Sequence, residues 1–188
     1  MLDAMLPHEP AHEWSDDAQE VAQRAEEVRQ LARLRIRDQQ RVDAGRYKLG
    51  TFLVTQGASR AMIAGNVTDC AIVNMASMVA KEICPNMSVY SAAKAGVVAL
   101  TRAAATELAV HGIRVNVVLP EVVDTPMVAQ EFSAEEIARF AANHPLGRLC
   151  RPEEVAETVK FLCGPGSSCT SGVAVDVTYC FYKNSGRK

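Results

Sequence analysis

Two short apolar runs, separated by one long helical segment, limit the folds that this chain can adopt. The runs are CAIVNMAS at residues 70–77 and IRVNVVLP at residues 113–120. Both are rich in the branched apolar residues of strands that are buried on two faces, which is typical of parallel sheets. Between them, SVYSAAKAGVVALTRAAATELAVHG predicts a helix that stops at Gly112. A strand–helix–strand order predicts parallel strands joined by a right-handed crossover, and therefore an α/β fold.

A further helix is expected ahead of the first strand, over residues 47–65. Residues 1–46 differ from the rest because they are polar and rich in charge. From Ser15 this segment has helix-forming composition with a thin apolar stripe, and Gly45 is its candidate stop. We interpret residues 1–46 as a helical or partly disordered extension, with a partner-binding helix as the alternative, and residues 47–188 as one domain.

The last third of the chain continues the alternation of helices and strands. Ser133 and Glu136 have the spacing of a capping box ahead of a short helix. Pro152 suits the first turn of another helix, through EEVAETVKFLC, and VAVDV predicts a last strand. No internal repeat occurs, and no linker is long enough to separate two domains.

Charge and composition exclude several classes of function. A formal net charge of −2 gives no general attraction to nucleic acids or anionic membranes. No apolar run approaches the ~20 residues that a membrane span requires. The first residues show neither the pattern of a secretory signal nor that of an Arg-rich transit peptide. Six scattered cysteines without a C-x-x-C pair predict free thiols, and no metal site is expected. We therefore expect a cytoplasmic protein.

A serine, a tyrosine and a lysine have the spacing of a carbonyl-reduction site. Tyr90 and Lys94 are four residues apart on the predicted helix, so both side chains can reach one pocket. An ammonium beside a phenol favours the phenolate and lowers the pKa of the tyrosine, which suits it to general acid/base work. Ser77, at the end of the preceding strand, can hold a carbonyl oxygen beside that phenol.

This pattern resembles the Ser…Tyr-x-x-x-Lys signature of the short-chain dehydrogenase/reductase family. GTFLVTQGASRAMI is similar to the helix after the family's fourth strand, and HGIRVNVVLP to its sixth strand. HPLGRLCRPEEVAETVKFLC is similar to the late helix region, and GVAVDVT to the last strand. The resemblance covers about residues 47–178. Within the family, the chain is most similar to the 3-oxoacyl carrier-protein reductases and the type 8 estradiol 17-beta-dehydrogenase group.

The resemblance implies an oxidoreductase that uses NAD or NADP to reduce a carbonyl or to oxidise a secondary alcohol. It makes Tyr90 the proton donor, Ser77 the residue that orients the carbonyl, and Lys94 a partner of both the tyrosine and the nicotinamide ribose. It adds Pro120, Val123 and Thr125 as residues around the nicotinamide. The hydroxyl of Thr125 has an alternative reading as a turn hydroxyl before the next proline. Steroid, acyl thioester and sugar reductases share these motifs, so the substrate stays open.

The chain also departs from the family pattern. It has no TG-x-x-x-G-x-G turn to receive the pyrophosphate and no Asn-Asn-Ala-Gly strand end. Tyr47 stands at the position of a catalytic asparagine, and Glu121 and Ala80 stand where glycines are usual. Tyr179 and Cys180 replace a glycine pair. The resemblance thus implies a partial Rossmann-like sheet of strands five to seven, without the cofactor-binding half and with weak cofactor binding.

Two consequences concern partners. Strand five becomes an exposed edge, which invites pairing with another chain. In the family, the helices matching residues 47–64 and 90–109 pack against a partner subunit, which implies a homo-oligomer or an assembly with a full-length relative. Beside the enzyme, two alternatives stand: a non-catalytic fragment that binds partners through these helices, and an incomplete gene model. A mitochondrial location is the family's alternative to the cytoplasm.

Overall fold

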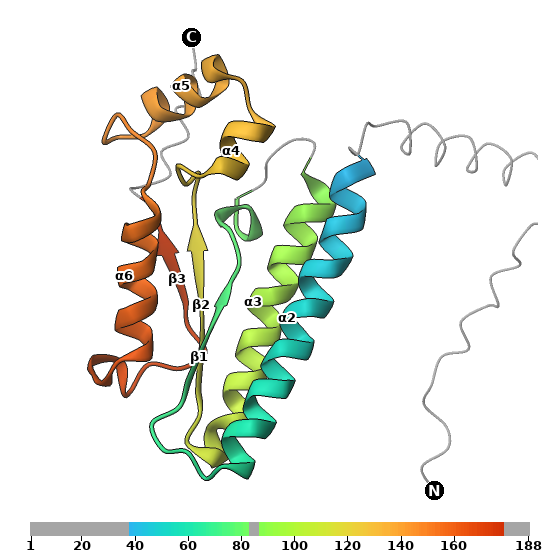
Figure 1. Ribbon diagram of the computed structural model, residues 1–188, viewed down its shortest axis with the longest axis vertical. Coiled ribbons are helices and arrows are strands. Elements are labelled where there is room, and N and C mark those ends of the chain that lie inside the picture. The colour runs from blue at the N-terminus through green and yellow to red at the C-terminus, as the bar shows by residue number, and fades with distance from the viewer. Residues whose placement is uncertain (1–37, 83–86, 179–188) are drawn as a thin grey trace, which may run out of the picture. The chain divides into compact units, whose positions relative to one another are not determined.

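The computed structural model describes residues 38–82 and 87–178, with side chains described from residue 49 onward. Its helices and strands alternate along the chain (Figure 1). They are α2 (Asp38–Ala64), β1 (Ala71–Met75), α3 (Ser88–Leu108), β2 (Arg114–Pro120), α4 (Pro126–Glu131), α5 (Ala134–Asn143), α6 (Pro152–Cys163) and β3 (Ala174–Val177). Short 3₁₀ turns follow β1, α3 and α6.

The three strands form a parallel sheet in the order β1-β2-β3, so the predicted α/β class is confirmed. β1 pairs with β2 from Ala71 opposite Arg114 to Met75 opposite Val118. β3 pairs with the carboxyl half of β2. β2 is the central strand, and its residues from Val115 to Pro120 are all buried. The apolar runs become strands because helices cover the sheet.

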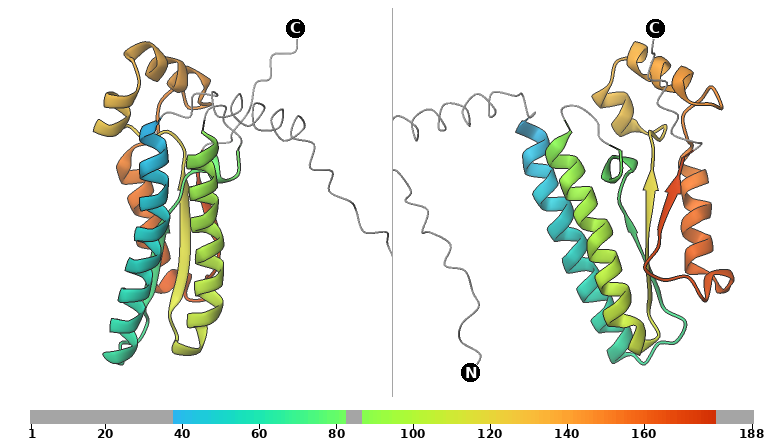
Figure 2. Two further views of the ribbon diagram at one scale, coloured as in Figure 1. Left: turned by 90° about the vertical axis from the view of Figure 1, so that its right-hand side faces the viewer. Right: turned by 180° about the vertical axis from the view of Figure 1, so that it is seen from behind.

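Helices cover the two faces of this sheet in different ways (Figures 1 and 2). On one face, Val97 of α3 packs with Val117 and Leu119 of β2, and α2 packs along the outer side of α3. On the other face, α6 packs on all three strands. Val118 of β2 and Leu162 of α6 meet in that second cluster. Alternate residues of β2 therefore pack against helices on opposite faces of the sheet.

A buried polar network joins α2, α3 and β1. The amide of Asn74 accepts a hydrogen bond from the Thr55 hydroxyl at 3.3 Å and donates one to the Thr101 hydroxyl at 2.9 Å. The Thr101 hydroxyl in turn donates to the Val97 carbonyl at 2.8 Å. All three polar residues are buried, so each needs its partners to offset the loss of water. The network fixes the positions of α2 and α3 along β1.

The ends of the helices follow the sequence signals. α2 ends at Ala64, immediately before Gly65, and the segment after α3 ends at Gly112, whose φ of 70° suits a residue without a Cβ. The capping box of Ser133 and Glu136 is formed, and Pro152 opens α6. These four expectations are confirmed.

Other expectations need correction or lie outside the described residues. α2 begins at Asp38 and passes through Gly45, so the predicted stop at that glycine is wrong. A glycine in a helix costs only about 1 kcal/mol relative to alanine. The helical residues on both sides of Gly45 outweigh this cost. The helical or disordered character expected for residues 1–37 lies outside the described residues. In the described part of the chain, no helix is long and apolar enough to cross a membrane.

Replacing Asn74 by alanine tests the polar network. We expect the free energy of unfolding to fall by about 2 kcal/mol, because two buried threonine hydroxyls lose a partner. Asn143→Ala, at the exposed end of α5, is the control and should stay within about 0.5 kcal/mol of the parent. Urea titrations followed by circular dichroism measure both. Equal losses in the two variants would contradict a structural role for the network.

Candidate active site

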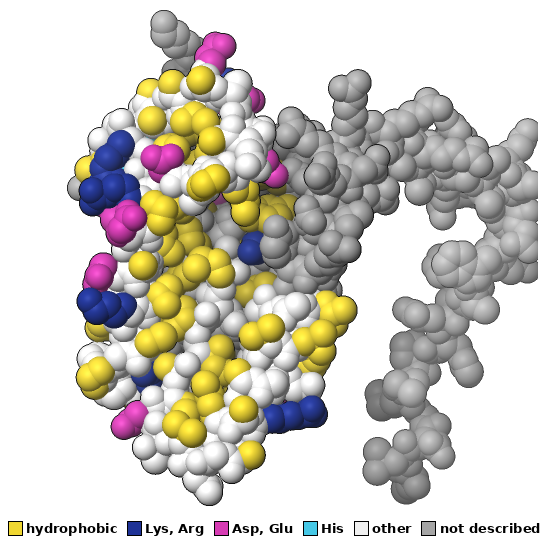
Figure 3. All heavy atoms as spheres, viewed as in Figure 1, with side chains coloured by type: hydrophobic (Ala, Val, Ile, Leu, Met, Phe, Trp, Pro, Cys, Tyr) yellow, Lys and Arg dark blue, Asp and Glu magenta, His cyan; other side chains and the backbone are white. Residues whose placement is uncertain are grey.

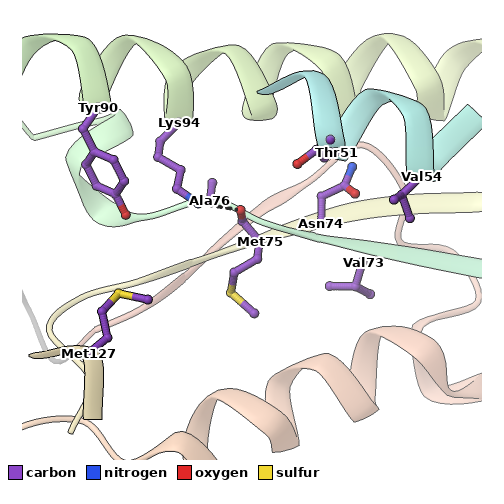
Figure 4. A pocket seen from close by; sticks show the side chains of 10 residues that line it. Thr51, Val54, Val73, Asn74, Met75, Ala76, Tyr90, Lys94 and Met127 are labelled. Atoms are coloured by element: carbon purple, nitrogen blue, oxygen red, sulfur yellow. Dashed lines mark hydrogen bonds between the residues drawn. The ribbon is translucent and has the colours of Figure 1, made fainter. Parts of the chain in front are cut away.

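A pocket of about 500 Å³ lies between α2, the β1 segment and the start of α3 (Figure 4). Three helices and one strand contribute side chains to it. Its lining residues are Gly50, Thr51 and Val54 of α2, the segment Val73–Ala76, Tyr90 and Lys94 of α3, and Met127 of α4. The pocket thus opens where β1 ends and α3 begins, which is where ligands bind in open parallel sheets.

Tyr90 and Lys94 enter this pocket from the first turns of α3. The Lys94 ammonium lies 5.7 Å from the centroid of the Tyr90 ring, within the range of a cation–π contact. It also donates a hydrogen bond to the backbone carbonyl of Met75 at 3.1 Å (Figure 4). The spacing of four residues therefore brings the phenol and the ammonium together, as the sequence predicts.

The Lys94 side chain is an unusual lysine because it is buried, with 7% of its surface exposed. Burial lowers its pKa below the ordinary value, since the charged form loses hydration. The hydrogen bond to the Met75 carbonyl replaces part of the hydration that the ammonium loses. A buried, hydrogen-bonded ammonium is held in one place, which a surface lysine is not. It is therefore a fixed source of positive potential beside the Tyr90 phenol.

Ser77 occupies a different position from the other two members of the triad. It follows the end of β1 with extended backbone, and its carbonyl accepts from the Ala80 N–H at 3.0 Å as a 3₁₀ turn begins. Ser77 is half-buried. Its neighbour Ala76 lines the pocket and Ser77 does not. The structure thus brings two triad residues into one pocket and leaves the serine at its border. Ala80, which stands where the family usually has a glycine, lies at the end of the same turn.

The residues expected around the nicotinamide lie at the end of β2 and in the segment after it, outside the pocket lining. Pro120 is the buried last residue of β2, and Val123 forms an isolated parallel bridge with Cys150. The Thr125 hydroxyl accepts a hydrogen bond from the Val128 N–H at 3.4 Å, so it caps α4. This cap is the turn role that the sequence offered as the alternative for Thr125.

Glu121 points its carboxylate at neighbouring side chains. The Thr178 hydroxyl donates to it at 2.5 Å, and the His144 ring nitrogen Nε2 lies 3.5 Å from it. Glu121 is not one of the pocket-lining residues. The carboxylate that replaces a glycine is therefore held toward β3 and the α5–α6 connection. The Tyr47 side chain and both Tyr179 and Cys180 lie outside the described residues.

Of the residues that line the pocket, the sequence analysis named only Tyr90 and Lys94, and two of those that it missed are informative. Met127 reaches the pocket from α4, a six-residue helix for which the sequence analysis gave no prediction. The signal for it was present, because Thr125 before Pro126 is a cap followed by a proline suited to the first helical turn. Asn74 also lines the pocket. Its contacts join residues far apart in the sequence, so no local pattern could have revealed them.

Comparison with known proteins places the chain in a family. The family model described as enoyl-(acyl carrier protein) reductase matches residues 46–179. The chain belongs to the short-chain dehydrogenase/reductase family. This confirms the resemblance seen in the sequence, including its extent.

Two curated relatives show how much of such proteins the chain covers. It is 41% identical over 129 residues to the (3R)-3-hydroxyacyl-CoA dehydrogenase of Homo sapiens, which covers 69% of this chain and 49% of that protein. It is 40% identical over 125 residues to estradiol 17-beta-dehydrogenase 8 of Callithrix jacchus, covering 66% of this chain and 92% of that protein. The chain spans about half the length of the human relative, and 44% and 56% of two further curated relatives.

Solved structures agree with this assignment. A 3-oxoacyl-[acyl-carrier protein] reductase from Brucella melitensis superposes with a TM-score of 0.63 at 32% identity, over 70% of this chain and 48% of that chain. An NAD⁺-bound xylitol dehydrogenase gives 0.63 at 30% identity, over 71% and 56%. The described sheet and helices are therefore about half of a Rossmann-like domain.

The buried ammonium of Lys94 predicts a pH dependence of stability. Because its pKa is lowered in the folded state, the unfolded chain binds more protons between the folded pKa and the ordinary value of 10.5. The free energy of unfolding therefore rises as the pH increases through that window. Below the window, Lys94 is charged in the folded protein and its burial destabilises the protein by the full amount. Lys94→Met should lack this rise.

The measurement is the difference in melting temperature between parent and Lys94→Met from pH 7 to pH 10. We expect Lys94→Met to have its largest relative advantage at pH 7 and to lose it toward pH 10. Lys160→Met, which removes an exposed lysine of α6, is the matched control. A constant difference across the range would show that the lysine is hydrated in the folded protein.

Proposed function

We propose that this protein takes part in NAD(P)(H)-dependent reduction of a carbonyl or oxidation of a secondary alcohol. The observation that carries the proposal is the shared pocket of Tyr90 and Lys94, with the ammonium 5.7 Å from the phenol ring. The nicotinamide cofactor supplies or accepts the hydride when it is bound. The names of the relatives, which are dehydrogenases and reductases, support the same reaction class.

Each residue of the site has a proposed role in this reaction. The Tyr90 hydroxyl gives a proton to the oxygen of the carbonyl that is reduced, or removes it in the reverse direction. Lys94 lowers the pKa of that phenol and can donate to ribose hydroxyls of the cofactor. Ser77, at the border of the pocket, orients the carbonyl. Backbone near Pro120 and Val123 flanks the nicotinamide, and Thr125 approaches its carboxamide.

The described residues suit only one end of the cofactor. A buried ammonium and a phenol facing a pocket of about 500 Å³ fit the nicotinamide ribose, which offers hydroxyls to both. The sequence provides no glycine-rich turn that could hold the pyrophosphate at a helix N-terminus. We therefore propose weak binding of NAD or NADP by this chain alone. Solved relatives include NAD⁺-bound and NADPH-bound proteins, so the choice between the two stays open.

An activity assay with a matched pair of variants tests this proposal. Oxidation of NADH and NADPH is followed with a 3-oxoacyl thioester and with a ketosteroid as substrates. Tyr90→Phe should lower kcat by about 10²–10⁴-fold, because it removes the proton donor and keeps the ring. Ser88→Ala, an exposed hydroxyl in the same turn, should leave kcat unchanged. Equal rates for parent and Tyr90→Phe would overturn the proposed role of the tyrosine.

A second candidate function is partner binding through α2 and α3. Leu49, Phe52 and Leu53 of α2 are 57%, 42% and 53% exposed, which is unusual for large apolar side chains on neighbouring helical turns. Figure 3 shows hydrophobic side chains over α2 as well as between α2 and α6. A homo-oligomer, or an assembly with a full-length relative through residues 47–64 and 90–109, would cover this surface.

Sedimentation equilibrium tests the oligomer. We expect the parent to associate and Leu53→Glu to weaken the association by about tenfold or more, since a charge replaces a leucine that the partner would cover. Leu146→Glu changes a similarly exposed leucine that lies outside both helices, and should behave as the parent does. A monomeric parent would refute this second candidate.

The free thiols of Cys70 and Cys150 support a reducing compartment, and we propose the cytoplasm.

A further inference from the structure

The Glu121 carboxylate connects three segments that are far apart in the sequence. Glu121 follows the last residue of β2, and its N–H donates to the Val177 carbonyl of β3 at 3.3 Å. Its Oε2 accepts a hydrogen bond from the Thr178 hydroxyl at 2.5 Å. The same oxygen lies 3.5 Å from Nε2 of His144, the residue that follows α5. One atom therefore meets the ends of β2, β3 and α5.

This meeting point is largely shielded from water. The His144 side chain is 6% exposed and the Glu121 side chain 19%. Ion pairs at the surface contribute little because water competes for both groups. Where water is scarce, polar contacts are stronger and a missing partner costs more. A carboxylate in this position therefore needs donors, and Thr178 and His144 supply them.

The ring of His144 has a defined orientation. Its Nδ1 accepts a hydrogen bond from the Leu146 N–H at 3.3 Å, so this nitrogen carries no proton. In a neutral imidazole the proton then lies on Nε2, the nitrogen that faces Glu121. The turn after α5 is closed by the Gly147 N–H, which donates to the His144 carbonyl at 2.8 Å. The ring therefore links this turn to the carboxylate.

Residues 121–150, which we call the α4–α5 segment, leave the sheet after β2 and meet again ahead of α6. Two backbone hydrogen bonds close the base of this segment. The Asp124 N–H donates to the Cys150 carbonyl at 2.8 Å, and the Cys150 N–H donates to the Val122 carbonyl at 3.3 Å. α4 and α5 lie between these ends, beyond the carboxyl ends of the strands (Figure 1). Because Met127 reaches the pocket from α4, the base decides where this part of the pocket wall lies.

The two helices of the α4–α5 segment contribute little to the core. Neither of them contains a fully buried residue. The Phe132 and Phe140 rings meet edge to face, with 5.1 Å between their centroids, and so pack the two helices on each other. Segments with few buried contacts open locally at low cost. Side-chain contacts at the base therefore have a large share in fixing the position of this segment.

We propose that Glu121 is a positioning residue for the pocket. Through Thr178 and His144, its carboxylate fixes the base of the α4–α5 segment to β3. It thereby places Met127 in the pocket wall, together with the backbone of residues 120–125 that is proposed to flank the nicotinamide. Glycine, which is usual in the family at this position, has no side chain for these contacts, so the role belongs to this chain. The part that concerns the nicotinamide rests on the proposed function, and the placement of Met127 does not.

Hydrogen exchange followed by NMR tests the role of the carboxylate. Glu121→Ala removes both side-chain contacts. We expect the amides of Asp124 and Cys150 to exchange at least about tenfold faster, because the base opens more often, and the amide of Val117 inside β2 to keep its rate. Glu135→Ala removes an exposed carboxylate of α5 and is the matched control, with the parent's rates throughout. Unchanged rates in Glu121→Ala, or equal acceleration at Val117, would overturn the proposal.

Two further variants separate this role from a loss of packing. Glu121→Gln keeps an oxygen that can accept from Thr178, so its exchange rates should lie nearer to those of the parent than the rates of Glu121→Ala do. His144→Phe keeps an aromatic ring and loses Nε2, so it should accelerate the same amides. Because the two residues act through one contact, the double variant should exchange no faster than the faster single variant. Additive effects would contradict a joint role.

The methyl group of Met127 reports on the pocket wall. In protein labelled with ¹³C-methyl methionine, its NMR signal is assigned through Met127→Leu. We expect this signal to shift in Glu121→Ala, because α4 moves relative to the pocket, and to stay in place in Glu135→Ala. A signal that stays in place in both variants would contradict the placement of Met127 by the carboxylate.

Fluorescence titration with NADH and NADPH separates this inference from the proposed function. For the cofactor that binds, we expect Kd to rise by about threefold or more in Glu121→Ala and to equal that of the parent in Glu135→Ala. An unchanged Kd beside faster exchange would contradict the role toward the nicotinamide. A parent that binds neither cofactor refutes the proposed cofactor use, and the exchange rates and the Met127 signal still decide the placement of the pocket wall.

Discussion

The hydrogen bonds of Asn74 are the interaction on which the rest of the structure depends. One buried amide accepts from Thr55 of α2 and donates to Thr101 of α3, and so joins three elements at one point of β1. The first turns of α3 carry Tyr90 and Lys94, and α2 forms the wall opposite the strand. A shift of either helix along β1 would separate these groups. A buried amide with both ends satisfied allows only one such arrangement.

The same arrangement holds Tyr90 and Lys94 in the pocket at the start of α3, beside the edge of the sheet that β1 forms. Lys94 is buried, contacts the Tyr90 ring and holds the Met75 carbonyl at the edge of the sheet. That edge is covered by helices above and below and lacks a described neighbour at its side. Family membership supports the proposed reaction class, and the pocket that holds Tyr90 and Lys94 borders this edge of the described sheet.

Local patterns predicted most of the fold and part of the site. The apolar runs, the capping box at Ser133 and the stop at Gly112 act within a few residues, so they are readable in the sequence. The spacing of Tyr90 and Lys94 is equally local. The stop expected at Gly45 failed because a weak local preference was outweighed by a long helix. The contacts of Asn74 and Glu121 join distant segments, which no local pattern records.

Residue-resolved hydrogen exchange of the chain alone tests the central claim, that β1 is an interior strand with one open edge. The amides of Ile72 and Asn74 point toward β2, and those of Ala71, Val73 and Met75 point away from it. Measured by NMR, the outward amides should exchange much faster than the inward ones. An alternating pattern of fast and slow exchange supports the account. Equal protection of both sets would mean that the edge is already paired, and would contradict it.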